Sequence, residues 1–211
     1  MTEFWESAFK EKQTMWGFEP ADVAVATMEF FCQNGLKKIL IPGFGYGRNA
    51  MIFKENEFDV TGIEISETAI DLARKHYGEG IKVYHGSVTD MPFDQELYDG
   101  IFCYALIHLL NRSERAKLIK DCYNQLAPDG YMVFVAISKN ASSYGTGKEI
   151  SKDRFETLHG VKLFFYDWDS INKEFGNYGL LEAKQINEPV KDVEGKLQMR
   201  LWLITCRKAS Y

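Results

Sequence analysis

The chain has 211 residues, of which 45% are hydrophobic, and a formal net charge of −5. This composition can build a full hydrophobic core, and the acidic balance argues against nucleic acid as the main partner. No apolar run reaches about 18 residues, and the charged start "MTEFWESAFKEKQ" lacks the apolar region of a signal peptide. We therefore expect no membrane association and a cytoplasmic location. The four cysteines are far apart and form no CxxC pair, so we expect buried free thiols and no metal site.

Short apolar runs alternate with helical patterns along the first two thirds of the chain. Before the first run, residues 2–34 have the pattern of one or two amphipathic helices. Strands are expected at residues 36–41, 59–65, 98–105 and 131–138, and the first three are followed by the helical patterns "GRNAMIFKEN", "SETAIDLARKHYG" and "NRSERAKLIKDCYNQL". Strands that alternate with helices predict a parallel sheet covered on both faces.

Capping residues support the expected helices. Ser66 can cap the second of these helices, and Asn111 with Glu114 three residues later resembles a capping box before the third. The sequence "PDG" at 128–130 is expected to stop that helix and turn the chain into the next strand.

The last third of the chain leaves the alternation. Residues 139–166 form a long excursion, and "DWDSINKEFG" has the pattern of a short helix. Two apolar segments follow, "GLLEAKQINEP" and "GKLQMRLWLITCRK", and the turn "VKDVEG" between them predicts an antiparallel pair of strands. We expect one domain over 1–211, with a helical segment at 1–35 and an insertion at 139–166.

The stretch "ILIPGFGYGRNA" places Gly43, Gly45 and Gly47 directly behind the first strand. A glycine-rich turn before a helix lets a ligand approach the main chain, and Glu64 at the next strand end lies about 20 residues on, where an acid can bind ribose hydroxyls. The dinucleotide pattern needs a glycine at position 48, where this chain has Arg48. The spacing therefore favours a nucleoside without a pyrophosphate over NAD, and a tight turn with an exposed carboxylate is the alternative.

These motifs together resemble those of class I S-adenosylmethionine (SAM)-dependent methyltransferases. The resemblance rests on "ILIPGFGYGRNA", "DVTGIEIS", "GSVTDMPF" and "LAPDGYMVFVAIS". The "IPG" form is similar to the thiopurine and thiol/halide branch, and "GRNA" with the tryptophan-bearing N-terminal segment is similar to tellurite-resistance methyltransferases. It implies a Rossmann-like three-layer α/β sandwich. In that fold a mostly parallel seven-stranded sheet has an antiparallel C-terminal strand, here with additional N-terminal helices. It also implies SAM as cofactor and S-adenosylhomocysteine as product.

The resemblance implies a set of cofactor contacts. The main chain at Gly43 and Gly45 would line the methionine part of SAM, Glu64 would accept the ribose hydroxyls, and Ile65 would contact the adenine face. The adenine edge would be surrounded by Val88, Thr89, Asp90 and Met91. For Asp90, whose carboxylate would accept from the adenine amino group, the alternative is a cap in its turn.

Three further residues each have two possible roles, and a fourth position differs from the residue that many family members have. Tyr104 would face the sulfonium or the nucleophile, or else pack in the core. His108 would be a general base, or a buried histidine bonded to the main chain, which we favour. Trp16 would close over SAM, or pack a terminal helix onto the domain. Ile41 stands where many members have an acid near the methionine end, so the group that holds the SAM ammonium is not identified.

The expected activity is in-line transfer of a methyl group to a small-molecule acceptor. The N-terminal helices and the insertion at 139–166, including "SSYGTGKEI", are expected to wall the acceptor pocket, although a plain surface loop is also consistent with that stretch. A protein or peptide methyltransferase and a non-catalytic SAM-binding module remain as alternatives. The acceptor, the use of a general base and the oligomeric state are left open by the sequence.

Overall fold

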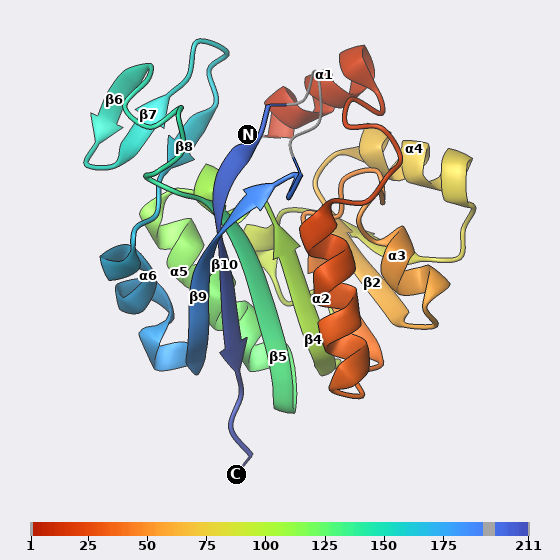
Figure 1. The fold of residues 1–211 in the computed structure, drawn as a ribbon. Coiled ribbons are helices and arrows are strands. Elements are labelled where there is room, and N and C mark those ends of the chain that lie inside the picture. Colours follow the sequence, from red (N-terminus) through yellow and green to blue (C-terminus); the bar gives the residue numbers. More distant parts are fainter. Residues whose placement is uncertain (1, 192–196, 211) are drawn as a thin grey trace.

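A seven-stranded sheet forms the centre of the computed structural model, which describes residues 2–191 and 197–210 (Figure 1). The strand order is β3-β2-β1-β4-β5-β10-β9. All neighbouring pairs from β3 to β5 are parallel, whereas β10 is antiparallel to both β5 and β9. The strands are β1 (Lys38–Pro42), β2 (Asp59–Glu64), β3 (Lys82–His85), β4 (Tyr98–Tyr104), β5 (Leu126–Ile137), β9 (Leu180–Glu188) and β10 (Met199–Arg207). The predicted fold class, including the antiparallel C-terminal pair, is confirmed.

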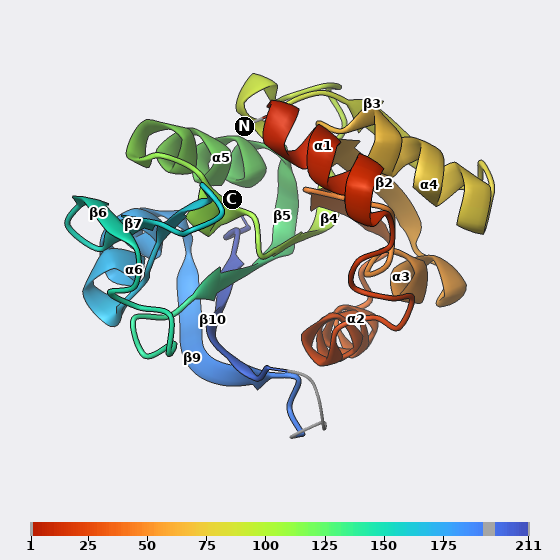
Figure 2. The same cartoon turned by 90° about the horizontal axis from the view of Figure 1, so that it is seen from above.

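Helices cover both faces of the sheet, because alternate strand residues point to opposite sides. On one face α2 (Asp22–Gln33) and α3 (Met51–Glu55) bury Phe31 and Phe53 against Ile39 of β1. On the other face α5 (Arg112–Gln125) and α6 (Trp168–Phe175) pack on Leu40 and its neighbours. Figure 2 shows the three layers from above.

Two helices form in the N-terminal segment, α1 (Thr2–Lys12) and α2. Helix α1 lies over the carboxyl ends of the parallel strands and is attached to α4 (Glu67–Tyr77), because Glu6 accepts hydrogen bonds from the Ser66 and Thr68 side chains. The helical pattern "GRNAMIFKEN" was too long a prediction, since α3 spans only Met51–Glu55. Gly47 is left-handed at φ 86°, and the chain makes turns up to the start of α3.

The predicted caps are present. Ser66 accepts from the Ala69 amide at the start of α4, and Asn111 and Glu114 form the capping box of α5. The predicted role of "PDG" is wrong, because α5 ends at Gln125 and β5 already includes residues 128–130. Asp129 and Gly130 are held by main-chain hydrogen bonds to Lys208, which follows β10, so pairing with the C-terminal strand extends β5.

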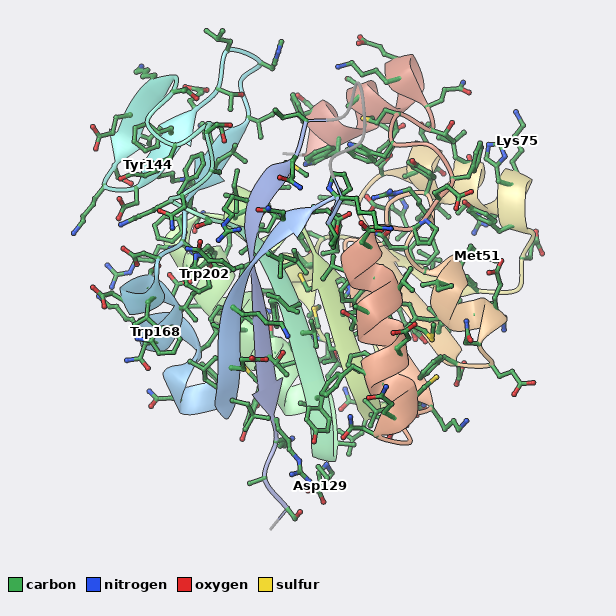
Figure 3. The ribbon with its side chains drawn as sticks, viewed as in Figure 1. Met51, Lys75, Asp129, Tyr144, Trp168 and Trp202 are labelled. Atoms are coloured by element: carbon green, nitrogen blue, oxygen red, sulfur yellow. The ribbon has the colours of Figure 1, made fainter. Side chains whose placement is uncertain are left out.

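The excursion at 139–166 contains a small sheet that the sequence did not predict. Its antiparallel strands are β6 (Lys148–Ser151), β7 (Arg154–Glu156) and β8 (Lys162–Phe164). Edge-to-face contacts of Tyr144 with Phe155 and Phe165 form its hydrophobic base. Figure 3 shows Tyr144 at the upper end of the molecule and Asp129 at the lower end. The small sheet and α1 thus stand over the carboxyl edge of the main sheet (Figure 1).

Two further expectations concern single features. Cys103, Cys122 and Cys206 are buried thiols as expected, but Cys32 is exposed on α2, because it lies away from the face that packs on the sheet. Most of the predicted turn "VKDVEG" lies outside the described residues. Among the helices that the structure describes, none has the length and apolar character needed to cross a bilayer.

Candidate functional site

The glycine loop leaves β1 at the carboxyl edge of the sheet. Gly43 and Gly45 are left-handed, with φ of 74° and 59°, a conformation that side chains disfavour. A Cβ atom at Gly43 would lie 3.0 Å from the Leu106 side chain, so the loop is packed closely there. A Cβ at Gly45 would meet nothing within 4 Å. The main chain at Gly45 is therefore open to the approach of another group.

Glu64 joins the glycine loop to the end of β2. Its carboxylate is only 6% exposed; Oε2 accepts from the Gly45 amide at 2.6 Å, and Oε1 accepts from the Ile65 and Ser66 amides at 2.9 Å each. Burial raises the pKa of Glu64, and the three amide donors oppose that effect. A carboxylate has about four acceptor positions, so about one remains for a ligand. The glycine loop, Glu64 and the partly exposed Ile65 are thus in contact, and their roles toward SAM stay predictions.

The segment after β3 forms a short 3-10 helix, η1 (Val88–Asp90). Ser87 caps it by accepting from the Thr89 amide, so Asp90 does not have the alternative role of a cap. Asp90 is exposed, and within the part of the chain that the structure describes its carboxylate has no hydrogen-bond partner. Val88 and Met91 are buried and form the apolar base of the turn. The exposed acid on this base can accept from a ligand.

Tyr104 ends β4 on the sheet face covered by α2, where its ring lies 6.2 Å from that of Phe102. Burial raises the pKa of Tyr104 to about 12; Glu188 raises it further, and Arg48 lowers it. The hydroxyl is therefore protonated at neutral pH. Ala105 follows with a left-handed φ of 53°, a strained conformation for a residue with a Cβ. The strand thus ends abruptly at the edge where the glycine loop lies.

His108 is the buried histidine that we favoured over a general base. It lies in the 3-10 helix η2 (Ile107–Leu109), is 7% exposed, and its Nδ1 is 3.2 Å from the Ile137 amide. Because that amide is the donor, Nδ1 accepts and the neutral ring carries its proton on Nε2. Burial lowers the pKa of His108 to about 4. In this geometry neither ring nitrogen is available to accept a proton.

Trp16 packs on the glycine loop through Tyr46. The two rings are stacked at 6.1 Å with an interplanar angle of 9°, and the Tyr46 hydroxyl accepts from the Trp16 amide and donates to the Gly17 carbonyl. Trp5 and Phe9 of α1 complete this aromatic cluster, although the Trp16 side chain itself remains half exposed. Trp16 therefore packs the N-terminal segment onto the domain, directly beside the predicted ligand loop.

The structure adds charged groups that sequence reasoning missed. Ile41 is buried in the core, but Glu188 at the end of β9 lies close enough to Tyr104 to raise its pKa. The Glu188 carboxylate accepts from the Asp22 and Val23 amides at 3.1 and 3.0 Å, which caps α2. Arg48 donates to the Glu19 carbonyl and lowers the pKa of the Tyr104 hydroxyl. No sequence pattern links these groups, because they come from opposite ends of the chain.

Comparisons with known proteins agree with this geometry. Residues 39–130 match the family model described as a methyltransferase domain. Thiocyanate methyltransferase 1 of Brassica oleracea is 28% identical over 133 residues, which are 61% of this chain and 59% of that protein. A ubiquinone biosynthesis O-methyltransferase of Actinobacillus pleuropneumoniae is 30% identical over 121 residues, 53% of this chain and 51% of that one. The chain thus spans between half and three fifths of the length of these relatives.

Solved structures extend the likeness to the whole fold. The 1,6-didemethyltoxoflavin-N1-methyltransferase of Burkholderia thailandensis, solved with S-adenosylhomocysteine, aligns over 99% of this chain and 87% of its own. The TM-score is 0.74 at 15% identity. The strand order and the glycine loop define a Rossmann-like methyltransferase fold. Residues 39–130 thus match a methyltransferase domain, and the chain as a whole has the fold seen in SAM-dependent methyltransferases.

Proposed function

We propose that the protein transfers the methyl group of SAM to a small-molecule acceptor by in-line displacement. The observation that carries this proposal is the contact of Glu64 with the Gly45 amide, 2.6 Å long, at the carboxyl ends of β1 and β2. Ligands of open parallel sheets bind at such an edge. The named relatives, which act on thiocyanate and in ubiquinone biosynthesis, support a small acceptor.

The residues present fit an adenosyl ligand. The remaining acceptor position of Glu64 would take one ribose hydroxyl, and a second would compete with the Gly45 amide. Asp90 would accept from the adenine amino group, with Ile65, Val88, Thr89 and Met91 around the ring. The methionine part would lie along Gly43 and Gly45.

Glu188 is the acid that we propose for the SAM ammonium, because Ile41 stands where many family members have an acid. The acid found in many family members is missing before the glycine loop, yet Glu188 at the end of β9 lies near enough to Tyr104 for its negative charge to raise the pKa of the hydroxyl. We place the SAM ammonium on the side of Glu188 and its carboxylate on the side of Arg48. Opposite charges at short range favour both charged forms.

In methyl transfer, the main task of the protein is to orient SAM and the acceptor. The sulfonium of SAM supplies an activated methyl group, and holding a nucleophile in line with it can lower a barrier by roughly 7–11 kcal/mol in favourable models. Tyr104 keeps its proton at neutral pH, and the neutral His108 accepts from the Ile137 amide at Nδ1 and carries its proton on Nε2. We infer that the acceptor reacts as an anion or loses its proton to solvent, with Tyr104 as a hydrogen-bond donor.

Calorimetric titration with S-adenosylhomocysteine tests the donor site. Replacing Glu64 with alanine removes the ribose acceptor and the contact to the glycine loop, so affinity should fall by roughly a hundredfold, about 3 kcal/mol. Glu29→Ala, an exposed carboxylate on α2, is the matched control and should bind normally. The proposal is contradicted if Glu64→Ala binds S-adenosylhomocysteine with unchanged affinity. It is also contradicted if the protein binds NAD in place of S-adenosylhomocysteine.

Incubation with labelled SAM then tests the acceptor class. A panel of small thiols, halides, phenols, amines and carboxylates is compared with a peptide library under the same conditions. Transfer to at least one small molecule supports the proposal. Transfer to peptides alone indicates a peptide methyltransferase, and binding of SAM with no transfer to any acceptor indicates a binding module.

A further inference from the structure

A groove of about 330 Å³ lies between α1, the start of α5 and the small sheet. Phe4 and Trp5 of α1, Leu109 of η2 and Val161 of the β7–β8 turn give it apolar walls. Two of its lining elements are close to segments of the predicted donor site. Trp5 is 6.4 Å from Trp16 in the aromatic cluster over the glycine loop, and η2 follows directly after the end of β4.

Arg154 is the unusual residue of this groove. Its Nε atom is buried and lacks a hydrogen-bond partner, and within residues 2–191 and 197–210 the side chain has no ion pair. An arginine presents its donors as a planar fork suited to a carboxylate or similar oxyanion. No polar partner within the described residues therefore fixes this side chain, and the guanidinium of Arg154 lines the groove.

The neighbouring charges do not satisfy Arg154. Arg115 lies near enough to lower its pKa further, after burial, but Arg115 is itself bound to Glu174 by a charged hydrogen bond of 2.7 Å. Glu114 also lines the groove and its charge raises the pKa of Arg154, but its Oε2 accepts from the Asn111 amide in the capping box of α5 and it forms no ion pair with Arg154 among the described residues. Lys162 adds a second positive charge at the exposed rim. The groove is thus locally basic in an acidic protein.

We propose that this groove binds the methyl acceptor, and that the acceptor combines an apolar body with an anionic group that pairs with Arg154. The proposal rests on the methyl transfer proposed above and narrows its substrate class. The apolar walls take the body of the acceptor, and the guanidinium of Arg154 receives a carboxylate or comparable oxyanion. Lys162 contributes attraction from the rim.

Binding of matched probes to the protein saturated with S-adenosylhomocysteine tests the charge preference. Benzoate and benzenesulfonate carry the anion, and benzamide is the neutral isostere. We expect benzoate to bind at least roughly tenfold more tightly than benzamide, as a charge-assisted pair does. Arg154→Gln should bring that ratio close to one, and Arg154→Lys should restore part of it. Lys152→Gln, which removes an exposed cation of the β6–β7 turn that does not line the groove, should keep the full preference.

The affinity for S-adenosylhomocysteine, measured in every variant, separates the two proposals. If the wild-type protein does not bind S-adenosylhomocysteine, the methyltransferase function is contradicted. In that case titration of the unliganded protein with benzoate and benzamide still shows whether the groove prefers an anion. Normal cofactor affinity in Arg154→Gln shows that the variant is folded. Equal binding of benzoate and benzamide, no binding of either, or a preference that survives in Arg154→Gln would overturn the anion site.

Discussion

His108 owes its properties to the amide of Ile137 and to its burial rather than to its place near the predicted site. An imidazole whose Nδ1 accepts a main-chain hydrogen bond inside the protein is held neutral, with its pKa lowered to about 4. The unfolded chain binds a proton at an ordinary pKa near 6.5. Stability from the neutral ring is therefore complete above pH 6.5 and is lost as the pH falls towards 4.

This gives a stability prediction for His108→Asn, in which the amide oxygen can replace Nδ1 as acceptor without titrating. Between pH 7 and pH 5 the free energy of unfolding of the wild type should fall on the order of 2 kcal/mol more than that of the variant. Urea denaturation at the two pH values measures the difference. Parallel losses in both proteins would show that His108 does not set this dependence.

Glu6 acts at the level of an element, because it attaches α1 to the start of α4. Its carboxylate accepts from the Ser66 hydroxyl at 2.7 Å and from the Thr68 hydroxyl and amide. The hydrogen bond from Thr68 is the main cause that lowers the pKa of Glu6 to about 2. The attachment is thus complete above pH 4.5 and is lost as the pH falls through 2. Ser66 follows Glu64 by two residues, so α1 is attached beside the predicted donor site.

Replacing Glu6 with alanine should release α1 without unfolding the sheet. Hydrogen exchange of the α1 amides is expected to rise by roughly tenfold, because about 1.5 kcal/mol of charged hydrogen bonding is lost. Exchange in β4 and β5 should not change. Glu11→Ala, an exposed acid of the same helix, serves as control. Equal exchange in both variants would mean that the aromatic cluster alone holds α1.

At the scale of the whole molecule, Arg115 and Glu174 join α5 to α6 across the layer below the small sheet. The Arg115 side chain is 4% exposed, its guanidinium lies 3.8 Å from the centre of the Phe164 ring, and its Nε and Nη2 both donate to the Glu174 carboxylate. Tyr166 also donates to Glu174. Two helices and the last strand of the small sheet therefore depend on one buried ion pair.

Glu174→Ala should leave Arg115 buried with its charge unpaired. We expect a loss of about 3–5 kcal/mol, since breaking one side of a buried pair costs more than the pair contributes. Thermal unfolding should show a midpoint lower by roughly 10 °C. Lys173→Ala on the exposed face of the same helix should change it little. A loss under about 1 kcal/mol in Glu174→Ala would indicate that water reaches Arg115.

The main sheet and its caps were predictable because their signals are local. The apolar runs and Ser66 or Asn111 act within a few residues of the structure that they specify, so the strand and helix order follows from them. The contact between the glycine loop and Glu64 follows from their spacing for the same reason, whereas the other donor-site residues were expected only from the family resemblance and stay predictions. The small sheet was not, because β6 is exposed at every residue and shows no alternation.

Groups that act across long sequence separations could not be predicted. Glu188 caps a helix that begins 166 residues earlier, and Arg154 lies near Glu114 only because the small sheet folds over α5. The one available signal for Arg154 was its place beside Phe155 in "DRFE", where a buried phenylalanine marks a strand whose neighbours point the other way. That pattern indicates a strand but not its partner.

The hydrogen bonds from the start of α2 to Glu188 also affect the order in which parts of the structure form during synthesis. The amino-terminal part leaves the ribosome first, and α2 can form as soon as its own residues are free. The amides of Asp22 and Val23 then donate to water until residue 188 has left the ribosome and β9 has joined the sheet. The capped start of α2 is therefore among the last parts of the structure to form.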